Sequence, residues 1–134
     1  MTKQLRAYLR LLAGLIMISC LGQLAFPARV AAASAWGNAP GWQREIGFWN
    51  IAIDAGCAFV VWRGVPAFTR PMSAMLVLLS AMLGGNHLAA ALAAGTQPSA
   101  IHWNGFIENA LAVVAGALAL AFTRGDARSG RIDR

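Results

Sequence analysis

The sequence predicts an all-α protein, a transmembrane bundle of four helices. Hydrophobic residues make up 58% of the 134 residues and charged residues only 12%, against roughly 25% charged residues in soluble domains. The apolar residues fall into four runs about 20 residues long, the length that a helix needs to cross a bilayer. These runs leave room for one membrane domain, predicted over residues 1–123, followed by a basic tail over residues 124–134.

The net charge of +6 is concentrated at the ends of the apolar runs. Basic residues precede the first run, lie between the second and the third, and follow the fourth: Lys3, Arg6, Arg10, Arg63, Arg70, Arg124, Arg128, Arg131 and Arg134. Short loops rich in Lys and Arg stay in the cytoplasm. We therefore expect a protein of a bacterial inner (plasma) membrane, with both termini cytoplasmic. Nucleic acid is not an expected partner, because no groove-reading motif accompanies the charge.

The first apolar run, predicted as a helix over about 8–35, has more than one interpretation. It either ends at Pro27 or continues through a kink to Trp36, which would place Arg29 inside the membrane. Its basic start and the small residues at 31–35 also resemble a secretory signal that is cleaved.

An internal repeat favours retention of the first run. Residues 37–48 align without a gap with residues 95–106, and a Gly, a Pro, a Gly and a Phe coincide. If this repeat is structural, the protein consists of two parallel helical hairpins. The first run is then the counterpart of the third and remains in the protein.

The other three helices are predicted at about 44–63, 71–94 and 102–122. Pro40 shortly precedes the first of these, in keeping with the preference of proline for helix starts. The third apolar run contains the pair Gly84–Gly85, which permits close helix approach.

Ionisable side chains inside the apolar runs are costly to bury and mark candidate sites. Asp54 and Asn50 are one turn apart and share a helix face. With a rise of about 1.5 Å per residue, Asp54, His87 and Glu108 all lie about 9–13 Å below one end of their predicted helices. The sequence therefore predicts a polar pocket in the outer leaflet, which Arg29 joins if the first helix is long.

The candidate ligand-binding or proton-handling residues are Asp54, His87, Glu108, Asn50, Asn86, Asn104, Arg29, Glu45 and Trp49. Most also have a structural interpretation. Arg29 could snorkel outward or pair with the carboxylates, and the asparagines could join helices by hydrogen bonds. Glu45 could be an interfacial cap, and Trp49 could belong to an aromatic belt.

A metal site is not expected, although two carboxylates and one imidazole can ligate a divalent ion. The sequence has no His-x-x-x-His or Glu-x-x-His spacing, and Arg29 would repel a cation. No cofactor motif is present either.

The run Glu45-Ile46-Gly47-Phe48-Trp49-Asn50 resembles the same part of the small DoxX-like membrane proteins. In families of this size an acidic or amide residue, a glycine, an aromatic residue and an asparagine recur there. The resemblance covers the layout of the whole chain but only these residues as a motif. It implies a four-helix bundle and transfers no functional positions.

Three classes of function follow from the predicted pocket. The favoured one is the binding or carrying of a small polar ligand or protons, because His87 would change charge near neutral pH. The second is an enzyme that uses a carboxylate and His87 as acid and base on a lipid-soluble substrate. The third is an accessory subunit whose polar layer fixes helix register. Association with a second copy or with a partner membrane subunit is compatible with each.

Overall fold

The computed structural model describes residues 2–97 and 99–132, with side chains up to Phe122. These residues form helices joined by turns: α1 (Lys3–Ala25), α2 (Pro27–Ala32), α3 (Pro40–Arg63), α4 (Pro66–Ala93) and α5 (Ala100–Ile132). Four segments are long and apolar enough to cross a membrane, namely α1, α3, α4 and Ala100–Phe122 of α5. Over the described residues, the all-α class and the four-helix transmembrane bundle are therefore confirmed.

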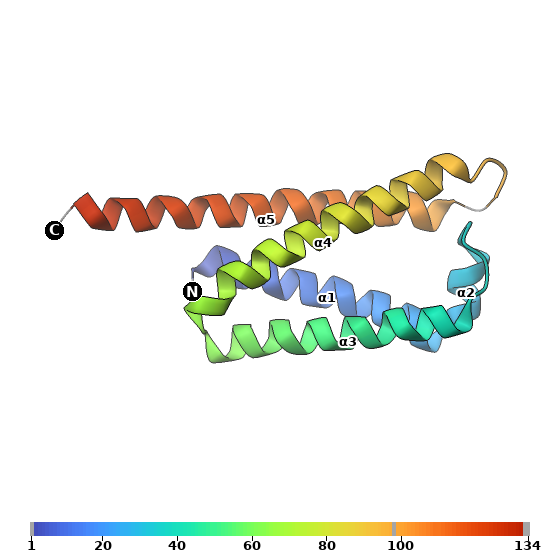
Figure 1. The fold of residues 1–134 in the computed structure, drawn as a ribbon, viewed down its shortest axis with the longest axis horizontal. Coiled ribbons are helices and arrows are strands. Elements are labelled where there is room, and N and C mark those ends of the chain that lie inside the picture. Colours follow the sequence, from blue (N-terminus) through green and yellow to red (C-terminus); the bar gives the residue numbers. More distant parts are fainter. Residues whose placement is uncertain (1, 98, 133–134) are drawn as a thin grey trace.

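The four long helices form two antiparallel hairpins (Figure 1). α1 lies along α3, and α4 lies along α5, in the most extensive contacts of the fold. α1 and α4 run in the same direction, so the two hairpins are parallel, as the internal repeat predicts. The N-terminus and the α3–α4 turn lie at one end, here called the N-terminal end. α2 and the α4–α5 turn lie at the other, here called the loop end.

The predicted first helix is divided into two. α1 begins after Thr2, whose hydroxyl accepts a hydrogen bond from the Leu5 amide at 3.4 Å. It ends at Ala25, because Phe26 precedes Pro27 and has left the helical conformation, with φ −130°. The chain then forms the six-residue helix α2.

The next two helices both begin about one turn earlier than predicted. α3 starts at Pro40, where a proline in the first turn gives up no hydrogen bond. It ends at Arg63 and is capped by Gly64, which is left-handed with φ 61° and donates its amide hydrogen to the Val60 carbonyl. α4 starts at Pro66, and Pro71 lies inside it.

The core lies at the N-terminal end, where both hairpins meet. Its buried side chains are Leu5, Tyr8, Leu9, Leu12, Cys57, Val60, Leu76, Ala112 and Ala119. Large apolar side chains cover the outside of the bundle: Trp62 is 79% exposed and Leu92 is 69% exposed. An apolar surface of this extent is unusual for a soluble monomer and suits contact with acyl chains.

Gly116 allows α5 to approach the core closely. A Cβ atom at this position would lie 2.6 Å from Cζ of Tyr8 and would also overlap Val77. We predict that Gly116→Ala lowers the free energy of unfolding by about 1–3 kcal/mol through overpacking. Thermal unfolding in detergent measures this loss. The control Gly14→Ala has open space around its Cβ and should be neutral or slightly stabilising; equal effects of both variants would contradict the packing.

Candidate functional site

A pair of histidines joins α4 to α5 near the loop end. Nδ1 of His87 lies 3.3 Å from Nδ1 of His102, which is a hydrogen-bond distance. His102 has no solvent-exposed surface, and His87 is partly buried. α5 begins at Ala100 and places His102 in its first turn, at the loop end, where the side chain is fully buried.

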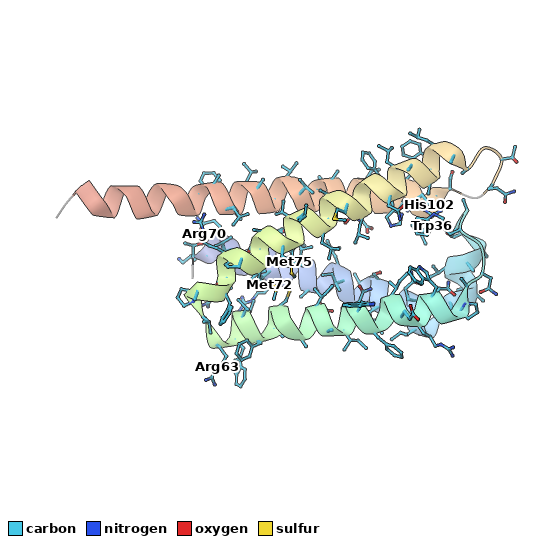
Figure 2. The ribbon with its side chains drawn as sticks, in the orientation of Figure 1. Trp36, Arg63, Arg70, Met72, Met75 and His102 are labelled. Carbon is cyan, nitrogen blue, oxygen red and sulfur yellow. The ribbon has the colours of Figure 1, made fainter. Side chains whose placement is uncertain are left out.

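The first hairpin supplies the other partners of the pair. The segment after α2 crosses to the second hairpin, where the amide of Ala35 donates to Nε2 of His102 at 3.0 Å. The hydroxyl of Ser34 lies 3.2 Å from the same nitrogen. Trp36 packs edge-on against His102 with ring centroids 4.4 Å apart, and its ring centroid is 5.1 Å from that of His87. Figure 2 shows Trp36 beside His102.

The Ala35 contact indicates where the protons lie when both rings are neutral. A backbone N–H can only donate, so Nε2 of His102 is an acceptor and carries no hydrogen. The neutral ring then carries its hydrogen on Nδ1 and donates it to Nδ1 of His87. His87 therefore accepts at Nδ1 and carries its own hydrogen on Nε2. The pair is a directed chain of hydrogen bonds that runs from the Ala35 amide to His87.

Glycines make room for this arrangement on both sides. A Cβ atom at Gly105 would lie 2.8 Å from three ring atoms of His87, so the imidazole occupies the space that a side chain would need. Gly37 has φ 74°, a conformation that favours glycine, in the turn that leads from Trp36 to α3. The position of the pair thus depends on backbone features of both hairpins.

Asp54 is buried elsewhere, on α3 of the first hairpin. The residue is 7% exposed, and both of its carboxylate oxygens are buried without a hydrogen-bond partner. About 21 Å of helix rise separates it from the start of α3 at Pro40, whereas about 9 Å separates His87 from the end of α4 at Ala93. The carboxyl group therefore lies deeper than the histidine pair.

The predicted convergence of Asp54, His87 and Glu108 is corrected by this geometry. Glu108 is exposed, and among the described residues no hydrogen bond or ion pair links any two of these three side chains. The predicted helix at 44–63 places Asp54 nearer to the loop end than α3 does, because α3 begins one turn earlier, at Pro40. Arg29 lies exposed on α2, against the ring of Phe26 at 5.4 Å, and does not pair with Asp54.

The remaining candidates lie at the periphery. Asn50 donates to the Ser19 hydroxyl at 3.3 Å and joins α3 to α1, which matches its structural interpretation. The exposed candidates are Glu45, Trp49, Asn86 and Asn104. In the part of the chain that the structure describes, no three His, Cys, Asp or Glu residues are grouped so as to hold a metal ion.

Sequence reasoning missed His102, Ser34 and Trp36. His102 is the first residue of its predicted helix, and Ser34 and Trp36 lie at the uncertain end of the first one, so the depth argument does not select them. One signal was available: the two histidines flank the same turn, fifteen positions apart, so both belong at the same end of the second hairpin.

No protein-family model, no curated protein and no solved structure matches this chain. The DoxX-like resemblance therefore remains a proposal that depends on the run 45–50.

Gly105→Ala should displace the His87 ring, because the added methyl group takes its place. We predict loss of the His87–His102 hydrogen bond and a decrease of about 1–3 kcal/mol in the free energy of unfolding. Nitrogen NMR of labelled histidines reports the bond, and thermal unfolding reports the stability. Gly85→Ala on α4 has open space and serves as the matched control. Unchanged histidine spectra in Gly105→Ala would show that the ring does not need this space.

Asp54→Leu should raise the stability of the protein. A buried carboxyl group without partners costs free energy, and its replacement by an apolar side chain should recover about 1–3 kcal/mol. Thermal unfolding in detergent and in lipid nanodiscs measures the change. Asp54→Ala removes the carboxyl group without adding a larger side chain and so separates the loss of charge from overpacking. The control Glu45→Gln changes an exposed carboxylate and should alter the free energy of unfolding by less than about 0.5 kcal/mol. A loss of stability in both Asp54 variants would mean that the carboxyl group has a partner in the membrane.

Proposed function

We propose that this membrane protein binds protons at the His87–His102 pair and that protonation changes the contact between its two hairpins. The observation that carries the proposal is the buried His102 ring, with one nitrogen bonded to the second hairpin and the other to the first. Histidine is the side chain that ordinarily changes charge between pH 5 and 8.

Each way of adding a proton removes a contact. A proton on Nε2 of His102 would face the Ala35 amide, and two donors cannot bond to each other. A proton on Nδ1 of His87 would likewise face the hydrogen on His102. The neutral pair thus holds the hairpins together at high pH, and this contribution is lost as the pH falls through the titration of the rings.

The described groups that face the pair carry no compensating charge. The groups that face the rings are the Ala35 amide, the Ser34 hydroxyl, the Trp36 ring and the backbone at Gly105. Among the described residues, no carboxylate lies within ion-pair distance of either imidazole. A proton on the pair therefore has to be accommodated by movement or by water.

The same geometry ranks the other functions. An enzyme that used Asp54 and His87 as an acid–base pair would need both at a shared substrate, within about 3 Å of the groups they act on, and their different depths do not favour this. The carriage of a small polar ligand would need a pocket that joins them. An accessory role predicts a histidine pair that holds the same protonation state over the physiological range.

The basic residues at the N-terminal end favour a cytoplasmic position for that end. We accordingly propose that the loop end faces outward across a bacterial inner membrane, where the pair would respond to external pH. DoxX-like membership is proposed on residues 45–50 alone.

Because the chain has two histidines, nitrogen NMR of histidine-labelled protein can follow both rings from pH 8 to pH 5. At pH 8 we expect His102 with its hydrogen on Nδ1 and His87 with its hydrogen on Nε2. On acidification both rings should change together, since they share one hydrogen bond. His87→Gln assigns the signals and should uncouple His102 from the partner ring.

Spin labels at the exposed positions Gly41 and Thr96 test whether the hairpins move, after replacement of Cys20 and Cys57 by alanine. The distance between the labels should increase or broaden at pH 5. Labels at Arg6 on α1 and Ala67 on α4, which are exposed at the N-terminal end of the two hairpins, should show a constant distance. Rings that keep one protonation state from pH 8 to pH 5, or hairpins that keep one separation, would favour the accessory role instead.

A further inference from the structure

A groove runs between α1 and α5 at the N-terminal end of the bundle. Its volume is about 420 Å³, within the range of about 300–1,000 Å³ that is usual for small-molecule clefts. Ala7, Tyr8 and Leu11 form one wall, and Leu118 and Phe122 form the other. The groove lies within two of the membrane-length segments, so its surroundings in a bilayer are acyl chains.

The groove has a polar end. Gln4 lines it at the start of α1, where its amide can donate and accept hydrogen bonds. The exposed basic residues Lys3 and Arg10 stand four positions before and three positions after Ala7, and this spacing places them beside Ala7 on the helix surface. An apolar channel thus ends at the Gln4 amide and the positive charge of Lys3. Arg10 lies about 9 Å of helix rise further along the same wall, and helical side chains tilt back toward the N-terminal end, so its long side chain can reach the same headgroup.

We propose that this groove binds one acyl chain of an anionic phospholipid, with the phosphate held by Lys3, Arg10 and Gln4. The apolar walls match the chain, and the two cations match the negative headgroup. A neutral lipid would fill the walls equally well but would leave the charges unused. The assignment is independent of the function proposed for the histidine pair.

Native mass spectrometry of the full-length protein tests the site, with phosphatidylglycerol and phosphatidylcholine of identical chains as probes. We expect one saturable phosphatidylglycerol site with a preference of at least about tenfold over phosphatidylcholine, since each basic residue near a headgroup is worth roughly fivefold. Arg10→Gln should reduce this preference roughly fivefold. Arg63→Gln is the matched control, because Arg63 is also exposed and lies at the same end of the bundle but on α3, away from the groove between α1 and α5.

Ala7→Phe should fill the groove and lower binding of phosphatidylglycerol at least about tenfold. Ala52→Phe places the same change on the exposed surface of α3 and should leave binding within about twofold. Circular dichroism and gel filtration verify that each variant is folded, and Arg10→Gln tests the same site without a change of shape. Equal binding of both lipids, insensitive to Ala7→Phe and Arg10→Gln, would overturn the proposal. Lipid-free dimers that Ala7→Phe dissociates would overturn it in favour of a second copy.

Discussion

A bilayer supplies no water to hydrogen-bonding groups, so each polar group inside it must find its partners within the protein. The His102 imidazole meets this requirement completely, because it is fully buried and both of its nitrogens are bonded. One partner belongs to α4 and the other to the turn of the first hairpin. Satisfying this one ring therefore fixes how the two hairpins meet at the loop end.

Two buried hydroxyl groups of α4 meet the same requirement locally. Thr69 and Ser73 on the buried face of α4 bond back to carbonyls one turn earlier, at 2.9 and 2.8 Å, a local solution that needs no neighbouring helix. Asp54 has no such solution. The histidine pair and Asp54 thus differ in their expected effect on stability. The neutral histidine pair is expected to stabilise the fold through its hydrogen bonds, whereas the unpartnered carboxyl group of Asp54 is expected to destabilise it. Buried carboxyl groups without a hydrogen-bond partner inside membranes are typically retained because they bind a ligand or a proton.

The fold was predictable from the sequence, and the site was only partly so. Four long apolar runs bounded by charge determine four helices, and an error of a few residues at an end leaves that result unchanged. The site depends on those few residues. The start of α3 at Pro40 instead of residue 44 moves Asp54 about 6 Å deeper, which separates it from the level of His87. The contact of Trp36 with His102 depends on a turn that no periodicity describes.

The repeat adds a reason for the asymmetry of the site. Gly47 and Gly105 occupy corresponding positions in the two hairpins, and each faces a side chain of the preceding long helix at a distance too short for a Cβ atom. In the first hairpin this side chain is Leu24, and the contact is apolar packing. In the second it is His87, whose nitrogens require partners that an apolar hairpin cannot offer. His102 supplies one partner, and the first hairpin stabilises His102 in turn through its loop. A single polar side chain in a glycine gap thus accounts for the link between the two hairpins at the loop end, whereas apolar packing joins them at the N-terminal end.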